Sequence, residues 1–169
     1  MAQNEENQAW DAGHRLWPLP KLPWIMRQSW TDVLFIHYPI RIDVLRNLVP
    51  AGLQLDAYDG WGWIGLVLFN TEKVSFRGIP AFYAFPELNI RTYVRTDGKP
   101  GVYFFSLDAM HWPTVILGRI FCHLPYSHAN MTVRRNGESI TFGSRRKQEP
   151  SIGLNCSYRF TSTTRPDLR

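Results

Sequence analysis

The sequence predicts a mostly β member of the α+β class: an antiparallel, barrel-like or cone-like sheet with two short helices. Six or more strand-sized segments are separated by turn signals, and only two segments have apolar residues at helical spacing. The dipeptide Asn136-Gly137 favours a two-residue hairpin turn, which joins antiparallel strands. A chain of 169 residues suits one domain. We expect residues 17–169 to form it, after a flexible, polar segment at 1–16.

In the first half of the chain, Met26 to Tyr38 has apolar residues on both sides, which predicts a strand buried on both faces. Apolar residues within 42–49 recur at helical spacing, and Pro50 ends this short helix. Trp61 to Asn70 is the second predicted strand.

The second half continues with two predicted hairpins and a second helix. Glu87–Arg95 and Val102–Asp108 are strands joined by a turn at 96–101, and Trp112–Cys122 has helical spacing. Further strands are expected at 128–134, 139–142 and 154–162.

Composition narrows the class of protein. Hydrophobic residues make up 44% and charged residues 20%, which is typical of globular proteins. No signal peptide and no apolar run of about 20 residues is present, so we expect a cytoplasmic protein without a membrane span. Cys122 and Cys156 lack metal-ligand spacing. Two free, buried thiols are the simpler interpretation, and a disulfide between them remains open.

The formal net charge of +5 comes from 15 arginines and 4 lysines that are spread along the chain. The densest cluster, Arg145-Arg146-Lys147, lies in a polar stretch that we interpret as a solvated loop. Nucleic-acid binding through the arginines is therefore the weakest of three functional hypotheses.

The strand 87–95 carries the best candidate site. Side chains alternate along a strand, so Glu87, Asn89 and Arg91 share one face. If that face lines a cavity, Arg91 can hold a carboxylate and Glu87 can act as an acid or base. The equally simple alternative is a satisfied ion pair or a solvated strand face.

Four further residues are candidates for the same cavity: Arg27, Asp108, Tyr126 and His128. Asp108 also suits a structural role as the cap of the following helix. His123 and His128 are five residues apart, which does not match the usual metal-ligand spacings. Tyr126 with either histidine could form an acid/base pair. We expect no metal and no cofactor.

Several phrases in order are similar to those of the YqjF-like family, a bacterial domain of unknown function. They lie at 24–28, 30–35, 53–56, 87–94, 100–109 and 124–126. The resemblance implies the fold of the acetoacetate decarboxylase-like superfamily, a closed β-cone or barrel around a small-molecule cavity. Family chains are usually longer, so this chain is expected to be a truncated form or to lack terminal strands that others have.

The resemblance also implies a site. In acetoacetate decarboxylases, an acidic residue and an arginine lie beside a Schiff-base lysine. The comparable place here is 123–126, where Tyr126 stands in the lysine's position. A Schiff base requires an activated amine. Lys21, Lys73, Lys99 and Lys147 lie near prolines, turns or a basic stretch. We therefore do not expect acetoacetate decarboxylase activity.

These observations favour a domain that binds a small organic acid or carbonyl compound. Glu87 and Tyr126 are its candidate catalytic residues, and Arg91 its anion clamp. The candidate ligand-binding residues beside Arg91 are Asn89, Arg27, Asp108 and His128. The alternative is a non-catalytic structural protein that forms a homo-oligomer through an exposed edge strand.

Overall fold

A computed structural model describes residues 22–78 and 84–160. The predicted flexible segment 1–16 lies outside the described residues. The strands are β1 (Met26–Ile40), β2 (Gln54–Leu55), β3 (Gly62–Phe76), β4 (Phe85–Thr96), β5 (Lys99–Ala109), β6 (Tyr126–Asn136), β7 (Ser139–Arg146) and β8 (Gly153–Arg159). The helices are α1 (Ile42–Arg46) and α2 (Trp112–Cys122).

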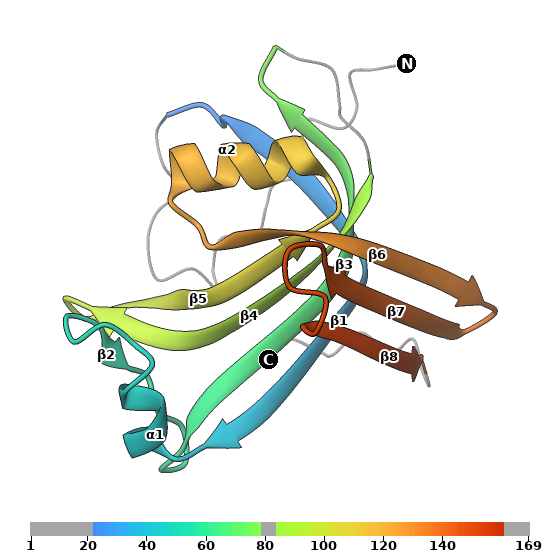
Figure 1. Ribbon diagram of the computed structural model, residues 1–169. Helices are drawn as coiled ribbons and strands as arrows, with labels where there is room; N and C mark the ends of the chain where they lie inside the picture. Colours follow the sequence, from blue (N-terminus) through green and yellow to red (C-terminus); the bar gives the residue numbers. More distant parts are fainter. Residues whose placement is uncertain (1–21, 79–83, 161–169) are drawn as a thin grey trace, which may run out of the picture.

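The strands form one curled sheet in the order β1-β3-β4-β5-β6-β7-β8, and β2 pairs with β4. Every neighbouring pair is antiparallel except β5 and β6, which run parallel. Parallel neighbours require a crossover connection, and α2 supplies it. Figure 1 shows the sheet curling into a half-barrel, with α2 lying over one end and β6 to β8 reaching across the open side. The predicted mostly β fold with two helices is confirmed.

The two faces of the sheet carry separate cores. One core joins the two halves of the sheet and consists of Leu68, Leu88, Ala129, Met131 and Phe142. The other lies under α2 and consists of Phe85, Leu107, Ala109, Val115 and Tyr126. Neighbouring residues of β4, such as Leu88 and Glu87, therefore point to different environments.

The first and last described strands meet across the curl of the sheet. The Tyr158 hydroxyl on β8 donates a hydrogen bond of 2.6 Å to the backbone carbonyl of Asp32 on β1. The Asp32 carboxylate also pairs with Arg135 on β6 at 3.4 Å. Asp32 has a positive φ of 52° at a register shift of β1, which is the geometry of a β-bulge. This bend carries the strand towards β8.

Three local predictions were wrong. β1 is an edge strand with mostly exposed side chains, because β3 pairs with one side of it and no described strand pairs with the other. Arg145 and Arg146 belong to β7 rather than to a loop. Cys122 and Cys156 are free thiols, as predicted, but Cys122 is exposed and Cys156 is half-buried.

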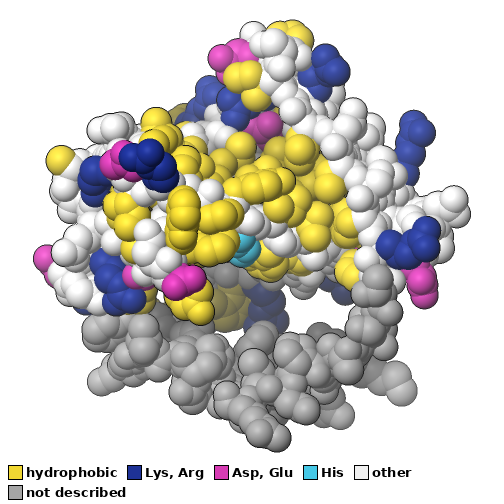
Figure 2. Space-filling model, turned by 90° about the horizontal axis from the view of Figure 1, so that it is seen from below, with side chains coloured by type: hydrophobic (Ala, Val, Ile, Leu, Met, Phe, Trp, Pro, Cys, Tyr) yellow, Lys and Arg dark blue, Asp and Glu magenta, His cyan; other side chains and the backbone are white. Residues whose placement is uncertain are grey.

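The underside of the molecule is broadly hydrophobic. Figure 2 shows apolar side chains gathered across the middle of this face, with charged side chains towards its margins. Over the molecule as a whole, the exposed apolar residues of β1 include Met26, Trp30, Phe35 and Tyr38. In the described ranges, no helix has the length and apolar character needed to cross a membrane.

Candidate functional site

A row of polar side chains follows one face of β4. Alternation along the strand places Glu87, Asn89, Arg91 and Tyr93 on this face, as the sequence predicts. Glu87 is 7% exposed and Asn89 is 3% exposed, which rules out a solvated strand face for these two residues. Buried polar groups need partners or a function.

Glu87 meets Tyr126 beneath α2. The Tyr126 hydroxyl lies 3.3 Å from both oxygens of the Glu87 carboxyl group. The Tyr126 ring lies against Gly118 of α2, where an added Cβ would be 2.5 Å from a ring carbon. A glycine at this point of the helix therefore lets the ring approach and reach Glu87. The structure thus brings together the two candidate catalytic residues.

Burial changes the acidity of both groups. It raises the pKa of Glu87 to about 7, and the hydrogen bond from Tyr126 acts in the opposite direction. The pKa of Tyr126 is raised above its ordinary value, first by burial and then by the Glu87 charge. At neutral pH, Glu87 therefore populates both its protonated and ionised forms, as a general acid or base must. Tyr126 stays protonated and acts as a hydrogen-bond donor.

Arg91 holds a positive charge that no carboxylate neutralises among the described residues. Its guanidinium carbon lies 5.6 Å from the centre of the Phe35 ring and 5.9 Å from that of Tyr93. The Arg91 Nε is buried without a hydrogen-bond acceptor. Aromatic faces stabilise a cation, but they leave its N–H donors available for an anion.

Two more buried polar atoms on this face lack partners. They are Asn89 Oδ1 on β4 and Thr71 Oγ1 on β3. The strand register pairs Thr71 with Phe85, two residues before Glu87, so both atoms lie on the same side of the sheet as the acid. A buried polar atom without a partner costs about 1–3 kcal/mol. Such a cost is typical of a site that a water molecule or ligand completes.

His37 and Tyr93 extend the row, and sequence reasoning missed both as functional residues. The His37 Nε2 and the Tyr93 hydroxyl lie 2.6 Å apart. His37 comes from β1 and Tyr93 from β4. Gly65 of β3 lies beneath both, since a Cβ added there would be 3.4 Å from the Tyr93 hydroxyl and 3.5 Å from His37 Nε2. Alternation along β1 puts Phe35 and His37 on one face, and this was the available signal.

The remaining sequence candidates are divided between the two faces. His128 shares the face of Tyr126, and its ring lies 6.0 Å from that of Trp112. Arg27 lies over the Trp24 ring at 5.1 Å near the start of β1, and the structure gives it no contact with Glu87 or Arg91.

Asp108 lies on the opposite face, since it pairs across the sheet with Leu88. Its carboxylate accepts hydrogen bonds from Arg146 at 2.8 Å and from Ser144 at 3.2 Å. The interpretation of Asp108 as a helix cap was wrong, because the N-cap of α2 is His111. Asp108 is instead satisfied by the arginine that the sequence analysis assigned to a loop.

Neither an amine nor a metal cluster accompanies Glu87 in the described part of the chain. Three lysines lie in these ranges, and Lys73, Lys99 and Lys147 are all exposed. Within the same ranges, no group of three or more His, Cys, Asp and Glu side chains is arranged to hold a metal ion. The polar groups described on this face of β4 include the Glu87 carboxyl group, the Tyr126 phenol, the Asn89 amide and the Arg91 guanidinium.

Solved structures share this fold at low sequence identity. An acetoacetate decarboxylase from Legionella pneumophila superposes with a TM-score of 0.65 over 88% of this chain and 57% of its own, at 14% identity. An acetoacetate decarboxylase-like enzyme from Sphingomonas wittichii RW1 gives 0.62 over 88% and 63%, at 16% identity. The enduracididine biosynthesis enzyme MppR, complexed with pyruvate, gives 0.60 over 82% and 58%, at 14% identity. These likenesses show the acetoacetate decarboxylase-like fold.

Sequence comparison is more specific. The chain is 48% identical over 139 residues to the uncharacterized protein YqjF of Bacillus subtilis (strain 168). The alignment covers 80% of this chain and 57% of YqjF, so the chain spans little more than half of that relative's length. The model of the DUF2071 family, described as an uncharacterized conserved protein, matches residues 27–168. This chain therefore belongs to the DUF2071 family, as the YqjF-like phrases in its sequence predict.

Proposed function

We propose that the polar face of β4 binds a small organic acid or carbonyl compound, with Arg91 as its anion clamp. The observation that carries this proposal is the half-buried Arg91 guanidinium, which has no carboxylate partner in the described residues. A guanidinium that already lies against two aromatic rings is pre-oriented, so it loses little freedom when it binds a carboxylate through two N–H donors.

Glu87 and Tyr126 supply the chemistry in this proposal. With its pKa near 7, Glu87 can give a proton to a ligand oxygen or carbon, or remove one from a carbon beside a carbonyl. The Tyr126 hydroxyl can donate a hydrogen bond to a carbonyl oxygen. The proposed chemistry uses no Schiff base, since the described lysines are exposed and none contacts this pair.

The ligand class is supported by the fold relatives. One solved structure of MppR holds pyruvate, which combines a carboxylate with a ketone. A molecule of that kind combines the anion that Arg91 would bind with a carbonyl group of the sort on which Tyr126 and Glu87 could act. The unpaired Asn89 Oδ1 would accept from a ligand hydroxyl or from a bound water molecule.

A titration of small acids tests this proposal. Pyruvate, acetoacetate and acetate are titrated into the protein by calorimetry, with acetone as the uncharged comparison. Arg91→Gln should weaken binding of a 2-oxo or 3-oxo acid by about tenfold or more, since a hydrogen bond to a charged group contributes about 1.5–3 kcal/mol. Arg134→Gln removes the same charge from an exposed site on β6 and should leave binding unchanged.

Glu87→Gln separates the binding of the ligand from the acid/base chemistry. It should preserve binding of the acid while abolishing any exchange of the ligand's α-hydrogens with deuterium from the solvent. Proton NMR measures that exchange. Equal binding by wild type and Arg91→Gln would refute the clamp, and unchanged exchange in Glu87→Gln would refute the acid/base role.

Self-association is the second candidate function, and the exposed edge of β1 favours it. Trp30, Phe35 and Tyr38 are each more than 40% exposed on this strand. An exposed apolar edge strand offers unpaired backbone groups to another copy. Light scattering over a hundredfold range of protein concentration tests it, and a strict monomer at all concentrations would contradict it.

A further inference from the structure

A separate pocket opens where β5 and β6 part. These strands pair over only three residue positions, from Leu107 with Tyr126 to Ala109 with His128. On the N-terminal side of Leu107, β5 diverges from residues 123–125, which join α2 to β6. A pocket of about 530 Å³ lies between these two segments. This volume is within the range of small-molecule sites, about 300–1,000 Å³.

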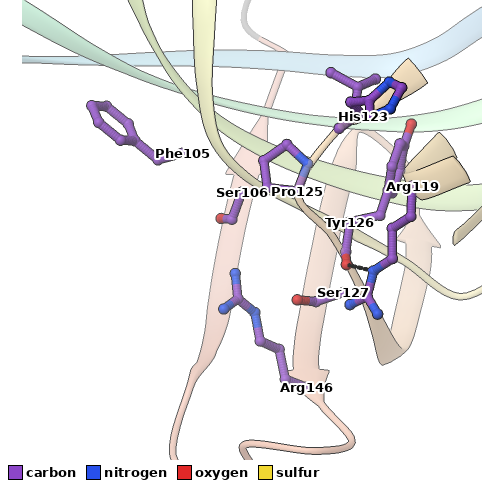
Figure 3. A pocket seen from close by; sticks show the side chains of 9 residues that line it. Phe105, Ser106, Arg119, His123, Pro125, Tyr126, Ser127 and Arg146 are labelled. Atoms are coloured by element: carbon purple, nitrogen blue, oxygen red, sulfur yellow. Dashed lines mark hydrogen bonds between the residues drawn. The ribbon is translucent and has the colours of Figure 1, made fainter. Parts of the chain in front are cut away.

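The polar lining of the pocket consists of hydrogen-bond donors from four elements. They are Ser106 on β5, Ser127 on β6, Arg146 on β7, and Arg119 and His123 at the end of α2. Figure 3 shows the two serine hydroxyls and the Arg146 guanidinium turned towards one another, with the Arg119 guanidinium beside Ser127. No aspartate or glutamate lines the pocket. Its chemistry is therefore that of an anion receptor.

Both guanidiniums are held in place and keep free donors. Arg119 Nε donates to the Tyr126 carbonyl at 2.6 Å, and its two terminal nitrogens have no partner in the described residues. Arg146 Nε donates to Asp108 at 2.8 Å and Nη1 donates to Glu149 at 3.4 Å. The Arg146 Nη2 donors therefore remain available to a ligand. The Arg146 charge is thus balanced by carboxylates, whereas the Arg119 charge is balanced by none among those residues. The pocket has a net positive charge.

This pocket is distinct from the β4 site. Ser127 pairs with Asp108, and Ser106 with Ile90, so both serines lie on the face opposite Glu87 and Arg91. In Figure 3 the Tyr126 ring rises away from Ser127 and Arg146, while its carbonyl faces Arg119. A ligand in the pocket would therefore contact the backbone of Tyr126 and not its hydroxyl.

We infer that this pocket binds a phosphate group, as the free ion or on a small phosphomonoester. A planar carboxylate accepts hydrogen bonds at about four lone-pair sites that lie in one plane, so it matches donors arriving from β5, β6, β7 and α2 less well than a tetrahedral anion does. A tetrahedral phosphate has three or four oxygens and a second negative charge for Arg119. The pocket is larger than a phosphate ion, so it leaves room for an organic group attached to the phosphate.

Calorimetric titration with inorganic phosphate and with glycerol phosphate tests the inference, with acetate as the planar comparison. We expect at least one of the two phosphates to bind, and more tightly than acetate. The tighter of the two identifies the free ion or the monoester as the ligand. Arg119→Gln should weaken phosphate binding about tenfold or more, because it removes the charged guanidinium that would donate hydrogen bonds to the phosphate. Arg134→Gln is the matched control and should change the affinity by less than about twofold.

The paired variant Ser106→Ala with Ser127→Ala keeps the charge and removes two hydroxyls that have no partner among the described residues. It should fold normally, as circular dichroism would verify, and should weaken phosphate binding several-fold. The inference is overturned if neither phosphate binds at millimolar concentration, or if acetate binds as tightly. Equal losses in Arg119→Gln and Arg134→Gln would also overturn it, because they would indicate diffuse attraction to a basic protein.

Discussion

Replacing Glu87 by glutamine should remove a defined pH dependence of the protein's stability. The Glu87 pKa is about 7 in the folded protein and 4.5 as its ordinary value. Because the folded state favours the protonated acid, stability is fully present below the unfolded pKa and is lost as the pH rises towards 7 and above. A shift of this size corresponds to about 3 kcal/mol in total, of which about 2.5 kcal/mol falls between pH 5 and pH 8.

Urea unfolding of wild type and Glu87→Gln at pH 5, 6, 7 and 8 measures this term. Glutamine cannot ionise, and its carbonyl can still accept the Tyr126 hydrogen bond. Taking the difference in unfolding free energy between the two proteins removes the contributions of all other titrating groups, which the two proteins share. It should move by about 2.5 kcal/mol in favour of glutamine from pH 5 to pH 8. A difference that stays constant across this range would refute the assignment of Glu87 as a buried acid with a raised pKa.

Three further substitutions test the contacts around both faces. Tyr126→Phe removes the hydrogen bond that lowers the pKa of Glu87, so that pKa should rise above its wild-type value in a carbon NMR titration; a fall would contradict the contact. Gly118→Ala places a Cβ 2.5–2.6 Å from Tyr126 ring carbons and should destabilise the protein by about 1–3 kcal/mol in urea unfolding. A gain in stability would mean that the helix accommodates the methyl group freely. Asp108→Ala leaves the half-buried Arg146 with the exposed Glu149 as its remaining carboxylate partner and should cost about 1.5–3 kcal/mol by thermal unfolding, whereas a neutral effect would show that water replaces the carboxylate.

Features that depend on neighbouring residues could be predicted from the sequence. The helix at Trp112–Cys122 was predicted with the bounds that the structure shows, because its apolar spacing and Pro113 near its start are local signals. The shared face of Glu87, Asn89 and Arg91 follows in the same way from alternation along one strand. The turn between β4 and β5 is tighter than predicted, since Lys99 and Pro100 already pair with β4.

Features that depend on distant residues were missed or came from the family resemblance. The Arg146 side chain has a loop-like local context, yet its partner Asp108 lies 38 residues away. His37 and Tyr93 are 56 residues apart, and no local pattern joins them. Burial of β1 was overestimated because an apolar strand looks the same at the edge of a sheet as at its centre. The pairing of Glu87 with Tyr126 was anticipated only through the lysine position of the superfamily.

The contact between Tyr158 and Asp32 has a consequence for the order of folding. The two residues are 126 positions apart, so the curl of the sheet closes only when nearly the whole described chain is available. At a synthesis rate of about 5–20 residues per second, Tyr158 is synthesised roughly 6–25 seconds after Asp32. In that interval the apolar side chains of β1 and β3 that later pack against β6 to β8 face solvent. We therefore expect the nascent chain to bind chaperones during this stage and to release them once β8 closes the sheet.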